Sequence, residues 1–381
     1  MTKYIKLLLL IIMLQFFGAN GCTSTKVDQD EIKKANQFFE SVFQDRVLDS
    51  PEFQSRLGYK SNYDQWDDIS YQRTRKNARL ATFDLEYLNE NISIEKLDNK
   101  TAISYRLMEK SLQRRIESDD FLFRQYLVTH RGGKHSSIPS FLINYHAIED
   151  ERDVQDYLSR LRNIEPLIED LIEELTLREE VGTIAPKFVF PKAIAVSKNI
   201  ISGFPFEEGK KQNVIYEDFV KKIDAIDLAD AVKLRYKSEA EAILVTVVNF
   251  SYRNLIDFLS EQELKATNND GVWKYPNGAE YYQYTLDQYT TLGLNAEEIH
   301  QIGLSEVERI HQEIYAIMQT VNFEGSLQEF FDFMRTDPQF YYPQSAEGRQ
   351  MYLDQVSVVV DTLSARIEEL FYGLPSIPLV V

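Results

Sequence analysis

The sequence contains one cysteine, Cys22, so it can form neither an internal disulfide nor a zinc site built from thiolates. Glycine and proline are also scarce, at 15 and 11 among 381 residues, which leaves few turn residues for a β-sandwich or barrel. Lys and Arg number 42 against 60 Asp and Glu, and the resulting net charge of -18 repels phosphate backbones. These shortages favour a mainly helical protein and exclude nucleic acid as an expected partner.

A long apolar run lies at the N-terminus, from Leu7 to Phe17, directly after Lys3 and Lys6. It is shorter than the roughly 17–25 residues that a transmembrane helix needs. The order of basic residues, apolar run and small residues is typical of a secretory signal.

The residues that end this signal, Ala19-Asn20-Gly21-Cys22, resemble a bacterial lipobox. We therefore predict a lipoprotein signal peptide over residues 1–21, lipidation of Cys22 and a polar tether over 22–30. Two acyl chains suffice for stable membrane anchoring. Since Thr23 follows the cysteine, we expect an exported protein anchored to the bacterial envelope, at the outer membrane and facing the periplasm or the surface. A plain secretory signal with a chance cysteine is the alternative.

Helical periodicity dominates the chain from Glu31 onward, and we predict an all-α, multi-helix fold. Apolar residues recur at spacings of three and four from Ile32 to Phe43 and from Leu158 to Ile172, which is typical of amphipathic helices. No Gly or Pro interrupts Asp227–Lys265, where we predict a long, centrally buried helix. Gly and Pro are spread through Gly182–Gly209, which we predict to be a structured crossover and not a helix.

The chain stops in the apolar run Leu374–Val381, shortly after a helical pattern that reaches Phe371. A natural terminus is usually polar and frayed. We therefore expect one helical domain over 31–381 that is incomplete at its C-terminus.

Metal-binding signatures are weak in this chain. Its five histidines form no His-Glu-x-x-His pattern. Two Glu-x-x-His units, ending at His300 and His311, fall on one predicted helix about 16 Å apart and cannot share an ion. Asn295 and Glu298 predict a capping box at the start of that helix. We interpret both units as polar flanks of a core stripe, with a substrate-facing His300 as the alternative.

Aromatic residues gather around a Pro276-Asn277-Gly278 turn and could line a pocket for a peptide or a sugar. Tyr282, Leu286 and Tyr289 have the spacing of one helical face and predict core positions. Tyr281 and Tyr284 are then expected in the wall of a cleft. Serine-hydrolase elbows, Walker loops and dinucleotide fingerprints do not occur.

Several segments together resemble the bacterial DUF885 family, across roughly Glu31 to Val381. The closest resemblance lies in Gly271–Tyr282, Tyr289–Thr291 and Ala296–Val307, and Ile138–His146, Asp156–Leu161, Pro186–Val189 and Gln339–Tyr342 agree with it. The resemblance implies a helical zinc metallopeptidase, similar in architecture to oligopeptidases and carboxypeptidases that enclose a deep channel between helices.

The resemblance also places the family's His-Glu-x-x-His element and remaining zinc ligand beyond Val381. Zinc is therefore expected only in a full-length form, and this chain alone is expected to hold no cofactor, no catalytic residue and no peptidase activity. Peptide is the expected ligand, and the possible channel residues are His146, Tyr281, Tyr282, Tyr284 and His300. The alternative is a non-catalytic surface lipoprotein that binds peptides or a protein partner.

Overall fold

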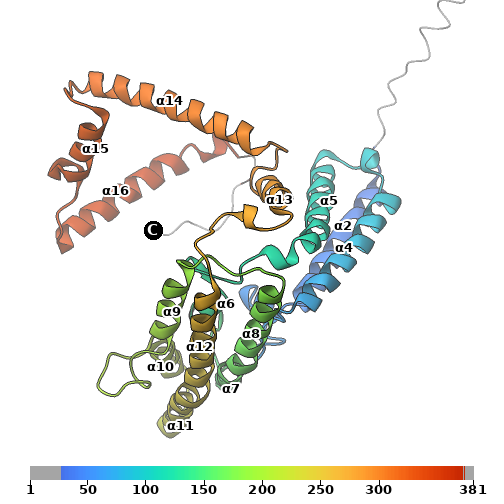
Figure 1. Cartoon of the computed structure of the whole chain (residues 1–381), viewed down its shortest axis with the longest axis vertical. Coiled ribbons are helices and arrows are strands. Elements are labelled where there is room, and N and C mark those ends of the chain that lie inside the picture. Colours follow the sequence, from blue (N-terminus) through green and yellow to red (C-terminus); the bar gives the residue numbers. More distant parts are fainter. Residues whose placement is uncertain (1–26, 372, 374–381) are drawn as a thin grey trace, which may run out of the picture. The chain divides into compact units, whose positions relative to one another are not determined.

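The computed structural model describes residues 27–371 and residue 373, and it confirms the all-α fold class (Figure 1). Within these residues the only strands are β1 (Val128–Thr129) and β2 (Gly132–Gly133), which form one antiparallel hairpin. Cys22, the predicted signal peptide and the run Leu374–Val381 lie outside the described residues. The lipid anchor and the proposed incomplete end therefore stay predictions.

The chain divides into two compact units, the first ending at Tyr289 and the second beginning at Thr290. The sequence predicted one helical domain over 31–381. The longer helices of unit 1 are α2 (Gln29–Leu48), α3 (Pro51–Arg56), α4 (Tyr71–Asn91), α5 (Asn99–Asp120), α6 (Lys134–Tyr145), α7 (Glu151–Arg162), α8 (Ile164–Glu180), α9 (Val189–Ile200), α10 (Val214–Ala225), α11 (Asp230–Ile243), α12 (Asn249–Lys265) and α13 (Gly278–Thr290). Short 3₁₀ turns cover Ile94–Lys96, Leu122–Arg124 and Val272–Lys274.

The N-terminal helices α2, α4 and α5 form a layer with its own apolar cluster. Asp28, Ser70 and Asp98 cap the three helices, each accepting a hydrogen bond from a backbone N–H of the first turn. The predicted helix over Ile32–Phe43 is confirmed as part of α2. The buried residues of this cluster are Ala35, Ala81, Leu88, Ile92, Leu97, Tyr105 and Leu112.

The larger core of unit 1 lies among α6 to α12. The predicted long helix is confirmed, since the chain is helical from Asp230 to Lys265 through α11, a π-helical turn over Leu244–Val248, and α12. Among the described helices it is the one long and apolar enough to cross a membrane. It supplies the centre of this core, where Leu244, Val248, Tyr252, Leu255 and Leu259 are fully buried.

The prediction for Gly182–Gly209 was wrong in part, because α9 occupies its middle from Val189 to Ile200. Pro191 falls in the first turn of α9, where a backbone N–H has no intrahelical acceptor and a proline costs little. The flanks are irregular, as predicted. Gly203 has a φ of 79°, and a Cβ there would lie 2.5 Å from the carbonyl oxygen of Lys211, so glycine is required.

A buried arginine on α7 ties the N-terminal segment to the larger core. The Arg160 side chain donates hydrogen bonds to Ser55 Oγ at 2.7 Å and to the carbonyl oxygen of Gln65 at 3.0 Å. Trp66 Nε1 donates in return to the carbonyl oxygen of Arg160 at 2.9 Å. These bonds fix the segment between α3 and α4 against α7, and Asp67 and Asp68 of that segment line a pocket.

Unit 2 consists of α14 (Ala296–Thr320), α15 (Leu327–Thr336) and α16 (Ala346–Ser364), with 3₁₀ turns at Pro338–Phe340 and Ile367–Glu369. The predicted capping box is confirmed: Asn295 and Glu298 each bind the other's backbone at the start of α14. Of the described residues in this unit, the buried ones are Met318, Phe330 and Gly348. Unit 2 thus has little core of its own.

Candidate ligand pocket

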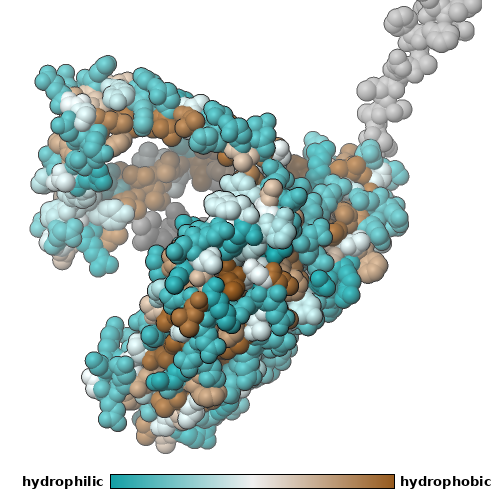
Figure 2. Space-filling view, viewed as in Figure 1, coloured by the Kyte–Doolittle hydropathy of each residue, from teal (hydrophilic) through white to brown (hydrophobic). Residues whose placement is uncertain are grey.

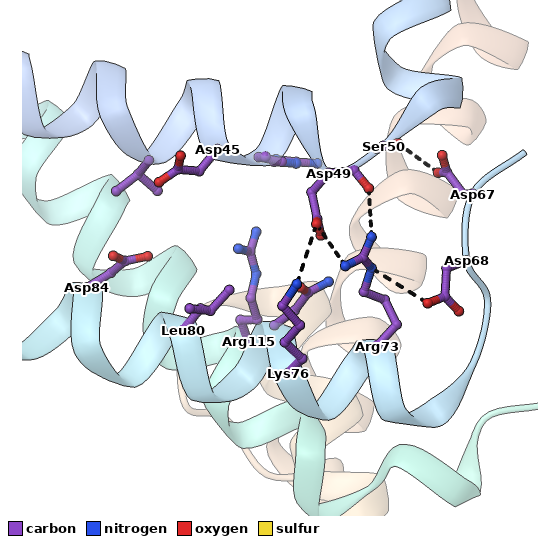
Figure 3. Close-up of a pocket in the computed structure, with 13 residues that line it drawn as sticks. Asp45, Asp49, Ser50, Asp67, Asp68, Arg73, Lys76, Leu80, Asp84 and Arg115 are labelled. Atoms are coloured by element: carbon purple, nitrogen blue, oxygen red, sulfur yellow. Dashed lines mark hydrogen bonds and ion pairs between the residues drawn. The ribbon is translucent and has the colours of Figure 1, made fainter. Parts of the chain in front are cut away.

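A charged pocket of about 590 Å³ lies in unit 1 between α2, α4 and α5 (Figure 3). Its volume is within the range of small-molecule sites, which is roughly 300–1,000 Å³. Residues of one face of α4, at spacings of three and four, form much of its lining. The lining residues are Val42, Asp45, Arg46, Asp49, Ser50, Asp67, Asp68, Arg73, Lys76, Asn77, Leu80, Asp84 and Arg115.

One end of the pocket is a saturated ion network. Arg73 lies 2.8 Å from Asp49 and 4.0 Å from Asp68, and Lys76 lies 3.9 Å from Asp49 (Figure 3). Burial opposes ionisation of Asp68, but hydrogen bonds from Ser70 outweigh it and lower the pKa of this carboxyl. Each charge here already has a partner, so this end supports the pocket and is not free to bind a ligand.

The hydroxyl of Ser50, at the same end, already makes two hydrogen bonds. It donates to Asp67 Oδ2 at 2.7 Å and accepts from the backbone N–H of Phe53 as the N-cap of α3. No histidine lines this pocket. Ser50 therefore lacks the general base that a nucleophilic serine needs.

The rest of the pocket carries charged groups without direct partners. The Asp84 carboxylate on α4 and the Arg115 guanidinium on α5 form no hydrogen bond or ion pair in the described part of the chain, and Asp45 on α2 lies across from Asp84 (Figure 3). Burial, then the nearby Asp45, raises the pKa of Asp84. Burial, then the nearby Arg46, lowers the pKa of Arg115, which Asp84 partly opposes. Both shifts mean that the charged forms are poorly compensated and would gain from a charged ligand.

One apolar side chain separates two of these charged groups. Leu80 lies between Asp84 and Arg115 (Figure 3) and is 47% exposed, and Val42 lies on α2 one turn before Asp45. The pocket can therefore hold a ligand that carries an ammonium group, an apolar body and a carboxylate. A carboxylate pair without nitrogen or sulfur ligands is a poor zinc site.

His146, expected in a substrate channel, lies in the core with no exposed surface. Arg160 Nη1 lies 2.9 Å from its Nδ1, and the carbonyl oxygen of Asp153 lies 3.2 Å from its Nε2. Since a guanidinium can only donate, Nδ1 accepts and the proton is on Nε2. The ring stacks on Tyr63 at 4.1 Å. This is the position of a structural residue.

The tyrosines of α13 differ in exposure from the sequence prediction. Tyr281 and Tyr284 pack on Phe121, with ring centroids 5.6 and 4.8 Å apart, while Tyr282 is 45% and Tyr289 86% exposed. The predicted core positions of Tyr282 and Tyr289 were wrong. The physical reason is that α13 packs on Phe121, at the end of α5, through Tyr281 and Tyr284. The buried face of α13 therefore begins at Tyr281 and not at Tyr282.

His300 lies in unit 2, exposed on α14, whereas His146 and the α13 tyrosines belong to unit 1. Within the residues that the structure describes, no group of three or more His, Cys, Asp and Glu side chains could hold a metal ion. The described residues therefore do not fit a zinc site.

Sequence reasoning missed the charged pocket. Its lining comes from three helices and two connecting segments between positions 42 and 115, so no short motif contains it. A signal existed in α4, where Arg73, Asn77, Leu80 and Asp84 share one helical face. Which face of α2 and α5 this stripe would meet could not be read from the sequence.

The sequence profile of the family described as "Bacterial protein of unknown function (DUF885)" matches residues 51–381. The chain belongs to the DUF885 family. The resemblance that the sequence segments indicated is thereby confirmed. No curated protein sequence matches this DUF885 chain.

Two solved structures share the fold of the DUF885 chain. One, from Colwellia psychrerythraea, is called a "putative lipoprotein" and matches with a TM-score of 0.79 and 22% identity over 93% of this chain and 62% of its own. The other, from Shewanella oneidensis, is called a "putative lipoprotein of unknown function". It matches with a TM-score of 0.60 and 14% identity over 91% of this chain and 60% of its own. The DUF885 chain thus spans about three fifths of the length of each.

Proposed function

We propose that this DUF885 chain is the peptide-binding portion of an exported, lipid-anchored envelope protein. The observation that carries the proposal is the pair Asp84 and Arg115, two part-buried opposite charges without direct partners in one pocket, with the apolar Leu80 between them. Asp84 and Asp45 would bind a ligand ammonium, and Arg115 a ligand carboxylate. A short peptide with free termini meets these requirements.

The anchor is supported by the sequence around Cys22 and by the names of the two solved structures. Cys22→Ala should release the protein from the membrane fraction, because lipid chains supply the membrane affinity. Retention of the variant in the membrane after a carbonate wash would contradict the anchor.

Peptidase activity is proposed only for a longer form of the protein. The described residues do not fit zinc, so we derive no zinc-dependent step from them. In a longer form, zinc would polarise a peptide carbonyl and a glutamate would activate water. The two solved structures support a longer form, since each extends well beyond the part that this chain matches.

The pocket can be tested by calorimetry of the purified protein with alanyl-alanine, its N-acetyl derivative and its C-terminal amide. We expect both blocked peptides to bind at least about tenfold more weakly, equivalent to about 1.4 kcal/mol. Asp84→Asn should remove the preference for a free ammonium, and Arg115→Gln the preference for a free carboxylate. Binding of the free peptide should weaken as the pH falls through the raised pKa of Asp84.

Matched controls exist on the same helices. Glu90 on α4 and Arg106 on α5 are exposed and lie outside the pocket. Glu90→Gln and Arg106→Gln should therefore leave affinity unchanged. Equal binding of all three peptides, or equal loss in the control variants, would refute peptide binding at this pocket.

A further inference from the structure

Unit 2 presents large apolar side chains to solvent on two helices. The patch is visible as brown residues on α14 and α16 (Figure 2). Each of its members is at least 43% exposed: Ile302, Val307, Ile310 and Ile317 on α14, and Met351, Tyr352, Val358, Val359 and Leu363 on α16. We call these residues the unit 2 apolar face.

The spacing of these residues shows that the face is organised. Val307, Ile310 and Ile317 follow one another at helical intervals on α14, with Glu308 and Gln312 on the other side. In α16 the apolar residues surround most of the helix, a pattern typical of helices that are buried in the folded protein. Each of the two helices thus exposes a set of large apolar side chains, and exposed apolar surface of this extent marks an interaction site.

Charge around the face limits what can cover it. Residues 290–381 contain 14 Asp and Glu but four Arg and no Lys. Three of these arginines already pair with carboxylates: Arg309 with Glu306 and Glu313, Arg335 with Asp332, and Arg366 with Glu369. Two copies of this face would bring like charges together, which disfavours self-association.

The length of the solved relatives indicates a polypeptide as the occupant. The Colwellia psychrerythraea structure matches 93% of this chain with only 62% of its own, so it contains substantial additional polypeptide. We infer that the unit 2 apolar face docks a helical polypeptide with an apolar stripe flanked by Lys and Arg, equivalent to that additional polypeptide. This inference is independent of the peptide pocket in unit 1.

The probe is a synthetic amphipathic helix with a Leu and Ile stripe and Lys flanks, labelled for fluorescence anisotropy against the whole purified chain. A scrambled peptide of the same composition and a peptide with Glu flanks are the comparisons. We expect the Lys-flanked helix to bind at least tenfold more tightly than either. Ile310→Asp and Val359→Asp should each weaken it by about tenfold, while Gln301→Ala, on the polar side of α14, should leave it unchanged.

The aspartate variants separate apolar docking from simple attraction between opposite charges. They add negative charge, so an interaction that depended on charge alone would become stronger in both. Equal binding of the scrambled peptide, or stronger binding by the aspartate variants, would overturn the inference. A dimer of the unliganded chain in analytical ultracentrifugation that Ile310→Asp abolishes would assign the face to a second copy and would also overturn it.

Discussion

Arg160 is the largest fully buried side chain in the described part of the chain, and it is charged. Burial lowers its pKa to about 10, which still leaves it charged at neutral pH. Its guanidinium faces the rings of Tyr63 and Phe141 at 5.0 and 4.9 Å, in addition to its hydrogen bonds to His146 and Ser55. Aromatic faces and neutral acceptors therefore contact the charge directly, while the carboxylates of Glu52, Asp64 and Asp156 favour it from a longer distance.

We predict that Arg160→Ala lowers the free energy of unfolding by about 3 kcal/mol or more. The substitution leaves a cavity and removes the donor from His146 Nδ1, Ser55 and the Gln65 carbonyl. Urea denaturation measures the loss. Arg152→Ala, at an exposed position on the same helix, should change the value by less than about 0.5 kcal/mol. A small loss for Arg160→Ala would show that the network contributes little.

Two buried histidines predict acid sensitivity. Burial, then the charge of Arg160, lowers the pKa of His146 to about 2, and burial lowers that of His135 to about 4, from an ordinary value of 6.5. The folded state keeps both rings neutral while the unfolded state protonates them. Each should therefore remove up to about 1.4 kcal/mol of stability per pH unit as the pH falls below 6.5.

Part-buried carboxyls with raised pKa values, such as Asp218, oppose this loss at lower pH. The histidine contribution is best isolated by the ring ¹⁵N chemical shifts of selectively labelled protein. The His146 and His135 signals should keep the values of neutral rings from pH 8 to pH 5. Titration of either ring in the folded protein within that interval would contradict the assignment.

The π-helical turn explains how one long helix keeps a single buried face. Tyr236 and Tyr252 are both buried, yet they are sixteen positions apart and a regular α-helix would place them about 160° apart. The extra residue of the turn over Leu244–Val248 absorbs about 100° of this rotation. About 60° remains, so both tyrosines can face the core.

We predict that deletion of Thr246 is tolerated, with a change in unfolding free energy within about 1 kcal/mol. Thr246 is exposed within the π turn, and its removal would restore α-helical geometry while keeping the same 60° between the tyrosines. Deletion of Arg253, also exposed but in regular helix, should cost more than about 3 kcal/mol because it rotates Leu255 and Leu259 out of the core. Thermal denaturation compares the two, and equal losses would refute this role of the turn.

The elements were readable from the sequence where periodicity was long and uninterrupted. The helix over Asp227–Lys265 and the capping box at Asn295 were predicted from such patterns. α9 was not, because Pro191 is permitted at a helix start and the sequence does not show where the helix begins. The tyrosines of α13 were assigned to the wrong face for a related reason. Two faces of this helix carry aromatic residues, and the sequence does not show which face packs against a neighbouring helix.

The two units differ in how much apolar surface they bury. Unit 1 has two core clusters, whereas the described part of unit 2 buries only Met318, Phe330 and Gly348. We predict that backbone amides of α14 and α16 exchange hydrogen faster than those of α8 and α12, by at least about tenfold, in the isolated protein. Mass spectrometry of the exchanged protein measures this, and equal protection would show that the unit 2 apolar face is already covered.

The pocket marks the limit of what could be predicted from the sequence. In the sequence, its charged residues cannot be distinguished from other surface residues. Only the packing of three helices brings Asp84 and Arg115 into the same pocket. Such a site depends on tertiary contacts between distant positions. By contrast, the family and the all-α class depend on local patterns, and those were predicted correctly.

The loop between α9 and α10 bears on how the protein can be engineered. The loop is visible between α9 and α10 in Figure 1, and its residues from Glu207 to Gln212 are exposed. Its end is fixed by Asn213, whose side chain donates to the carbonyl oxygens of Ile200 and Ser202. The two helices are therefore held together by contacts that do not depend on an unbroken chain between them. An affinity tag could therefore be inserted between Lys210 and Lys211 while the protein retains its fold.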